Sequence, residues 1–260
     1  PEVVQSRRWI ARPDRIKRDP FGELTTRETM HPGHRNPDWE EPSGPMNPDV
    51  NVLAVRRLDG SPLALFGSFS IHYVGSAALS ADYFGIFAQR VGELLEAGGE
   101  GQPFVGVLAN GVSGDAYLVD YTLEKRVPFD KQSIAETVAN AAVRAYRRIE
   151  WQTWLPLDMR ECELELKVRP PKTEWAKRVL ADVEAGREKA DSQSSVYARE
   201  QLILADMPPT RKLKLQALRI GSLAMVGVPC EVFAITGLRI AAQSPFEHTF
   251  TVMLANGYDG

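Results

Sequence analysis

After residue 48 the chain alternates between two patterns of apolar residues, one typical of strands and one typical of helices. The run from Val50 to Leu58 alternates in part, and a second apolar run from Pro62 to Ile71 follows the turn pair Asp59-Gly60. Together these three segments predict a β-hairpin. Residues 81–97 then carry apolar side chains at helical spacing, which predicts a helix directly after the hairpin.

The same two patterns recur toward the C-terminus. Helical spacing is found at 131–149, in the polar segment 172–206 and at 232–242. Strand-like runs lie at 104–109, 155–168, 213–220, 222–228 and 250–254. We expect the strand at 155–168 to have one solvent-facing side, because its apolar residues alternate with polar ones. Strands and helices therefore interleave, which predicts a single α/β domain with a mixed β-sheet core.

Two segments depart from this core pattern. Residues 1–48 are rich in Pro, Arg, Asp and Asn and show little periodicity, so we expect an ordered but irregular arm laid over the core. Residues 172–206 are charged and helical, and they predict a helical lobe on the surface. We assign both to the same domain, residues 1–260.

Composition narrows the function classes. Hydrophobic residues make up 43% and charged residues 25% of the chain, and the net charge is −3. Lys and Arg are not in excess, so nucleic acid is not expected as a partner. No apolar run approaches the roughly 18–20 residues that a bilayer span needs. Cys162 and Cys230 lie too far apart for a CxxC motif, so a single disulfide and two separate thiols both remain open.

Two residues at predicted strand ends are candidates for chemistry. His72 follows the apolar run Leu63–Ile71, a position that suits a metal ligand or general base; a histidine that closes the strand through ordinary hydrogen bonds is the alternative. Glu231 follows the run 222–228 and opens the helix predicted from Val232. A carboxylate there is well explained as a helix cap, and it is also a good oxygen ligand for zinc.

Further candidates lie in loops. In the segment 110–115 glycines would let backbone amides approach a substrate oxygen, although a tight glycine turn is the plainer interpretation. Asp82 falls in the first turn of the helix after His72 and would either orient a ligand or stabilise the helix start. His31 and His34 are separated by Pro-Gly, which forbids the helix that would align them, so we interpret them as part of a solvated turn.

These segments also occur in a recognisable order. The residues that carry it are Arg7-Arg8-Trp9, Asn36-Pro37, Gly44 to Pro48, His72, Ser80-Ala81-Asp82, Asn110-Gly111, Gly114-Asp115, Val228 to Glu231 and Asn256-Gly257-Tyr258. This order resembles the catalytic N-terminal domain of the neutral/alkaline, non-lysosomal ceramidase family, and the resemblance covers nearly the whole chain. Members of that family hydrolyse the N-acyl amide of ceramide with one zinc ion.

The resemblance implies that His72 and Glu231 are zinc ligands. The family adds a second histidine and a tyrosine, which would lie upstream of Pro1 and directly after Gly260, so we expect the protein to continue at both ends. The implied cofactor is Zn²⁺, which lowers the pKa of a bound water to about 7. With two of four ligands, residues 1–260 alone would bind zinc weakly.

The resemblance also places the substrate. Arg7 would anchor a substrate hydroxyl or carboxylate, Gly114 would lie against the substrate, and Asp115 and Asp82 would belong to the catalytic region. Tyr117 stands where the family has the serine of Gly-Asp-Val-Ser. Either that serine is dispensable here, or the substrate differs from ceramide. The second alternative argues against a sphingolipid substrate. We expect Tyr117, with the loop amides, to face the developing oxyanion.

The predicted function is zinc-dependent hydrolysis of an N-acyl amide bond in a small-molecule or lipid-like substrate. By the same resemblance the protein would be extracellular or periplasmic and take part in lipid metabolism, with peripheral contact to a membrane left open. A catalytically inactive binding or scaffold domain is the alternative, favoured by the loss of the serine. A serine hydrolase built on Ser113 is a third hypothesis and requires a histidine nearby.

Overall fold

The computed structural model describes residues 1, 3–99 and 103–259 of the chain. The hairpin predicted at residues 50–71 is confirmed as β7 (Asn51–Arg56) and β8 (Pro62–Phe69). Helix α1 (Asp82–Leu94) then crosses to β9 (Val105–Asn110), which lies parallel to β8. The three strands form one sheet in the order β7-β8-β9.

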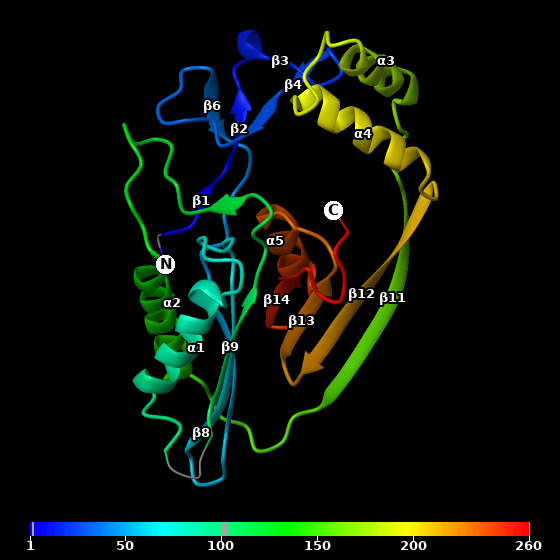
Figure 1. Ribbon diagram of the computed structural model, residues 1–260. Coiled ribbons are helices and arrows are strands. Elements are labelled where there is room, and N and C mark those ends of the chain that lie inside the picture. The colour runs from blue at the N-terminus through cyan, green and yellow to red at the C-terminus, as the bar shows by residue number, and fades with distance from the viewer. Residues whose placement is uncertain (2, 100–102, 260) are drawn as a thin grey trace.

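Two helices cover one face of this sheet and bury most of the core. Side chains of α1 and α2 (Lys131–Tyr146) pack on β8 and β9, and the helices lie together on one side of the strands (Figure 1). The fully buried members include Leu65, Phe69, Phe87 and Val138. The helical spacing predicted at 81–97 and 131–149 therefore marks the faces that meet the sheet.

The second sheet contains the C-terminal strands in the order β11-β12-β13-β14. Their bounds are Leu157–Lys167, Thr210–Ile220, Leu223–Val228 and His248–Met253. Strands β13 and β14 are parallel and joined through α5 (Ala234–Gln243). The two sheets meet where the ring of Phe66 stacks on that of Phe250, with 6.3 Å between centroids. Interleaved helices and mixed sheets confirm the predicted α/β class.

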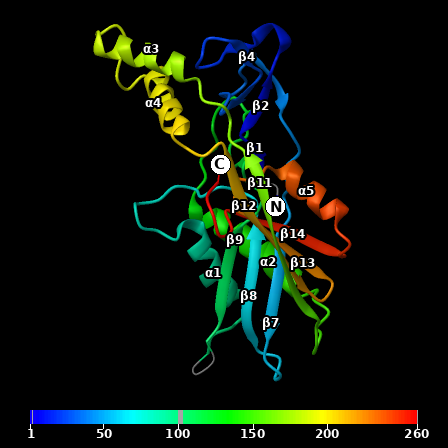
Figure 2. The same cartoon turned by 90° about the vertical axis from the view of Figure 1, so that its right-hand side faces the viewer.

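The N-terminal 48 residues contain more regular structure than their composition predicts. The short strands there are β1 (Gln5–Ser6), β2 (Arg8–Ala11), β3 (Lys17–Arg18), β4 (Leu24–Thr26), β5 (Glu28–Met30) and β6 (Trp39–Pro42). We call residues 1–48 the arm. Strands β2 and β4 of the arm and the helices α3 (Thr173–Glu184) and α4 (Gln193–Ala205) lie at one end of the molecule, away from the tips of β7 and β8, and β1 lies nearer the middle (Figure 2).

Side chains of Phe21 and Glu23 join the arm to the helical lobe. Phe21 meets Trp175 of α3 edge to face, with centroids 4.8 Å apart. Lys172, just before α3, lies over the same Phe21 ring and forms an ion pair with Glu23 at 3.0 Å. The helices predicted at 172–206 are thus confirmed, and their apolar stripe meets the arm in part.

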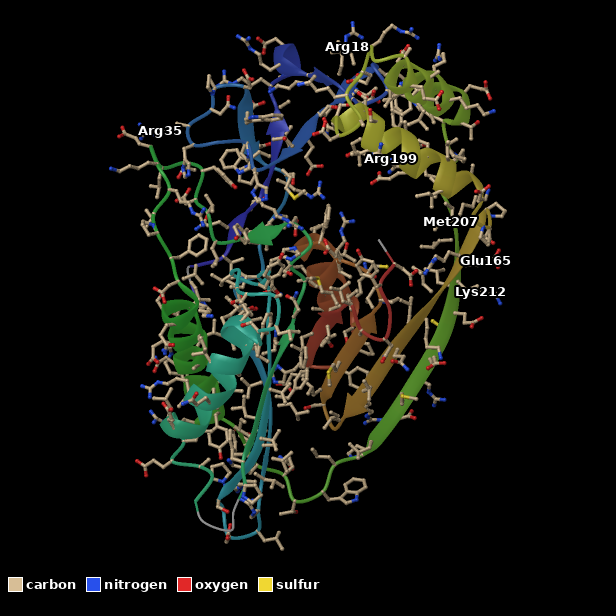
Figure 3. The ribbon with its side chains drawn as sticks, viewed as in Figure 1. Arg18, Arg35, Glu165, Arg199, Met207 and Lys212 are labelled. Atoms are coloured by element: carbon tan, nitrogen blue, oxygen red, sulfur yellow. The ribbon has the colours of Figure 1, made fainter. Side chains whose placement is uncertain are left out.

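The strand predicted at 155–168 forms, but the prediction of one buried side is wrong. All eleven residues of β11 are exposed, including Leu164 and Leu166 at 44%. Strand β11 is the edge of a ribbon that it forms with β12, and the labelled residues Glu165 and Lys212 lie side by side on it (Figure 3). An alternating pattern predicts a strand, but burial also needs a layer to cover it.

We expect Gly106→Ala to destabilise the protein by about 1–3 kcal/mol, because its added methyl group would lie 2.6 Å from the carbonyl oxygen of Ala88 and push α1 off the sheet. The matched control is Gly99→Ala, where no atom lies within 4 Å; there the change should stay within about 0.5 kcal/mol. Urea denaturation measures both. Equal effects of the two substitutions would contradict this packing argument.

Candidate functional site

Three strand ends gather at one edge of the core. His72 lies three residues after β8, the loop 111–115 follows β9, and Glu231 lies three residues after β13. Backbone hydrogen bonds join these segments, from Gly111 N–H to the carbonyl of Phe69 and from Gly114 N–H to that of Val232, both at 2.9 Å. The sheet topology therefore brings together the residues that the sequence singles out.

Gly114 allows the loop 111–115 to lie directly against the segment that follows β13. A Cβ atom at this position would collide with the carbonyl oxygen of Glu231 and lie 2.8 Å from the ring of Phe233. Its own carbonyl accepts hydrogen bonds from Arg7, at 2.9 Å from Nη2 and 3.3 Å from Nε. Gly114 thus contacts Glu231 on one side and the arm on the other.

Arg7 is the contribution of the arm to the site. The pairing of β1 with β10 (Ala116–Tyr117) and a hydrogen bond from Arg7 N–H to the carbonyl of Asp115 hold its backbone. Its guanidinium forms an ion pair with Glu231 at 3.5 Å. Burial lowers the pKa of Arg7, and the Glu231 carboxylate acts against that change. A guanidinium remains charged under these conditions and places a positive charge beside His72.

His72 has a ring nitrogen that its surroundings do not satisfy. Its Nε2 atom is buried and has no hydrogen-bond partner among the residues that the structure describes. Burial lowers the pKa of His72, Arg7 lowers it further, and Glu231 raises it. A neutral imidazole is the form that binds metals, and an unpaired buried nitrogen is costly unless something binds it.

Glu231 does not cap α5, so the capping interpretation is wrong. The helix begins at Ala234, two residues later than predicted, and its first amide donates to Asp115 Oδ1 at 2.9 Å. Asp115 is 1% exposed, and burial raises its pKa. Because Asp115 takes the capping role, the Glu231 carboxylate remains available to face His72 and Arg7.

The loop amides are not available for an oxyanion, so that prediction is wrong for three of them. Gly111 and Gly114 donate to backbone carbonyls, and Val112 N–H donates to Ser70 Oγ at 3.0 Å. Tyr117 is half-buried and meets the rings of His31 and Phe129 edge to face, each at 5.9 Å between centroids. The three amides are already used in hydrogen bonds. The hydroxyl of Tyr117 forms none within the described chain, so it is the group still free to donate.

His31 is a site neighbour that the sequence does not reveal. Its backbone is left-handed, with φ 59°, and its amide donates to the carbonyl of Arg7 at 2.7 Å. Its Nδ1 lies 2.5 Å from the hydroxyl of Tyr121. The turn 31–34 is therefore not merely solvated. Only the folding of the arm brings His31 beside Tyr117, and no local pattern signals that approach.

Comparisons with known proteins bear on the fold. No family model and no curated protein matches the sequence. Among solved structures, neutral ceramidase from Pseudomonas aeruginosa matches with a TM-score of 0.53 and 14% identity, over 82% of this chain and 40% of that one. A ceramidase complexed with C2 matches with a TM-score of 0.53 and 16% identity, over 82% and 42%. The chain has the ceramidase fold.

The match confirms the fold that the order of motifs implies. The chain spans about two fifths of the length of each ceramidase chain it matches. In residues 1, 3–99 and 103–259, no three His, Cys, Asp or Glu side chains are grouped to hold a metal ion. No helix in the same residues is long and apolar enough to cross a membrane. His72 and Glu231 are only two side chains, and zinc sites in proteins use three or four protein ligands.

Asp82 supports the loop that follows His72 and does not contact its ring. The carboxylate accepts hydrogen bonds from the amides of Val74, Gly75 and Tyr83 and from the hydroxyl of Ser76, at 2.8–3.0 Å. Its backbone is left-handed, with φ 49°. Burial would raise the pKa of Asp82, but these hydrogen bonds hold it below the usual value. Asp82 therefore orders the small-residue loop in this ceramidase fold.

Two remaining hypotheses are also decided. Ser113 is fully buried, and its hydroxyl donates to Asn110 Oδ1 at 2.9 Å, with Met253 Sδ as its other neighbour. A buried serine without a histidine partner is not a nucleophile, so the serine-hydrolase hypothesis is wrong. Cys162 and Cys230 are both free thiols, which settles the alternative of a disulfide.

We expect Asp82→Asn to lower stability by about 1–2 kcal/mol at pH 7, because the amide keeps the shape but loses the charge on four hydrogen bonds. The folded pKa is lowered, so this contribution is present above the unfolded value of about 3.9 and is lost as pH falls through the folded value. The difference from wild type should shrink accordingly in urea denaturation between pH 7 and pH 3. The control is Asp191→Asn, an exposed carboxylate, for which a comparable loss would contradict the assignment.

Proposed function

We propose that this chain carries part of a zinc-dependent site that hydrolyses an N-acyl amide bond. The observation that supports it most is the buried, unpartnered Nε2 atom of His72, with the Glu231 carboxylate close enough to act on its pKa. An imidazole and a carboxylate are both ordinary zinc donors. The neighbouring ceramidase structures share the fold that holds these two residues.

His72 and Glu231 would hold the metal, together with donors from outside the described residues. When bound, zinc polarises a carbonyl group and supplies an activated water at neutral pH. The low pKa of His72 keeps its imidazole neutral and ready to ligate. Glu231 now forms an ion pair with Arg7, so a bound metal would share that carboxylate with the guanidinium.

Arg7 and Tyr117 are proposed to act on the substrate. The Arg7 guanidinium is fixed by Gly114 and Glu231, so its remaining N–H groups are oriented with little loss of entropy on binding. Tyr117 would donate a hydrogen bond to the amide oxygen as negative charge develops there. This role replaces the one that the sequence assigns to the loop amides.

The full-length protein should contain one zinc ion per chain and hydrolyse N-acyl amides, and His72→Ala should remove both properties. Glu231→Gln should reduce zinc affinity by at least about 10- to 100-fold, the loss typical of removing a group that only supports a ligand. Metal analysis by mass spectrometry and release of fatty acid from a panel of N-acyl amides measure the two effects. His248→Ala is the control, because His248 lies at the start of β14, away from these strand ends.

Four outcomes of these measurements bear on the proposal. Amidase activity retained in His72→Ala would overturn the proposal. Zinc bound by His72 and Glu231 without any hydrolysis would favour the inactive binding domain. Loss of activity in Tyr117→Phe with unchanged zinc content would support its role on the amide oxygen, whereas unchanged activity would remove that role alone.

A further inference from the structure

The arm contains a pocket that the proposed reaction does not yet use. It has a volume of about 330 Å³ and lies between β2, β6 and the turn that follows His31. Trp9, Trp39 and Tyr121 supply its aromatic walls, and Arg12, Arg35 and Glu40 supply its charged groups. Arg35 is the labelled residue beside the loop that follows β10 (Figure 3).

The pocket adjoins the candidate site through the contact between Tyr121 and His31. Tyr121 lines the pocket, and its hydroxyl lies 2.5 Å from Nδ1 of His31. The amide of His31 in turn donates to the carbonyl of Arg7, and its ring meets that of Tyr117. A molecule bound at Arg7 and Tyr117 would therefore reach the pocket by passing the His31 ring.

The walls of the pocket suit a flat ring. Trp39 is 7% and Tyr121 is 8% exposed, so both rings are fixed by the surrounding arm. Large aromatic side chains held in this way bind other rings by stacking or edge contacts at small entropic cost. A volume near 330 Å³ is at the small end for ligand sites and fits an amino-acid side chain better than a long acyl chain.

The charges in the pocket suit an anion. Arg35 is held by the carbonyl of Thr122 at 3.2 Å and by Glu124 at 3.1 Å. Arg12 is exposed, and in the described chain its guanidinium forms no ion pair or hydrogen bond, not even with Glu40. A guanidinium with unused donors recognises a carboxylate by paired hydrogen bonds.

We propose that this pocket binds the amine-side half of the substrate, and that this half is an aromatic amino acid with a free carboxylate. The inference rests on the proposed function. Water would add its oxygen to the acyl carbon, the C–N bond would break, and the nitrogen would take up a proton. The products are a fatty acid and an aromatic amino acid, with the ring between the indoles and the carboxylate at Arg12.

Binding to the protein treated with a zinc chelator tests the pocket without any turnover. N-Acetyl-L-phenylalanine should change the tryptophan fluorescence of the protein in a saturable way, because Trp9 and Trp39 line the pocket. Its neutral analogue N-acetyl-L-phenylalaninamide should bind about tenfold more weakly, the size expected for one charge-assisted contact. Arg12→Gln should remove this difference, and Arg12→Lys should retain part of it.

The matched control is Arg27→Gln, which removes an exposed arginine of the same arm that does not line the pocket. It should leave both affinities as they are in the wild type. Equal binding of acid and amide by the wild type would overturn the proposal. Equal losses in Arg12→Gln and Arg27→Gln would do the same, because the effect would then be one of net charge.

Turnover separates this inference from the function on which it rests. The full-length protein should hydrolyse N-lauroyl-L-phenylalanine in preference to its carboxamide, with a KM about tenfold lower, and Arg12→Gln should abolish that preference. Hydrolysis of N-acyl amides without this preference would overturn the pocket and leave the proposed function intact. If no N-acyl amide is hydrolysed, the proposed function fails, and the fluorescence titration still decides the pocket.

Discussion

The site depends on a close approach between two backbone segments. The loop after β9 lies directly against the segment after β13, and Gly114 makes this possible because any side chain there would strike Glu231. Two hydrogen bonds hold the segments at this distance, one from the Gly114 N–H to the carbonyl of Val232 and one from the Ala234 N–H to Asp115 Oδ1. His72, Arg7 and Glu231 can act on one another only because this contact brings the two sheets together.

Burial and the neighbouring charges of Arg7 and Glu231 shift the pKa of His72. Arg7 is partly buried and forms an ion pair with Glu231, the carboxylate whose charge raises the pKa of His72. A positive charge beside an imidazole keeps it neutral, and a carboxylate beside a guanidinium limits the cost of burying both. The buried nitrogen of His72 is then the group in this cluster with an unsatisfied bonding capacity, which is why the metal proposal rests on it.

Local patterns predict the elements well and the site only in part. The hairpin at Asp59-Gly60 and the helix after His72 form as expected, because their signals are periodicity and turn residues within one segment. The role of Glu231 could not be predicted in this way, because the helix cap comes from Asp115, which lies 119 residues before the Ala234 amide that it accepts from. The contacts of His31 cannot be predicted for the same reason, since Tyr121, whose hydroxyl lies beside its ring, comes from the loop after β10. The ends of strands are therefore predictable, and the partners that meet there are not.

The edge strand β11 affects the tendency of one chain to associate with another. Its free side presents unpaired backbone groups to solvent along eleven residues, and such an edge is a template for pairing with another chain. Its sequence places Glu161, Glu163 and Glu165 on one face, and Lys212 and Lys214 of β12 neutralise part of that charge by ion pairs at 3.0–3.2 Å. A second copy approaching this edge in register would bring like charges together. The carboxylates of β11 therefore act against fibrous self-association. This repulsion comes from the charge on the strand, and added salt would weaken it by screening.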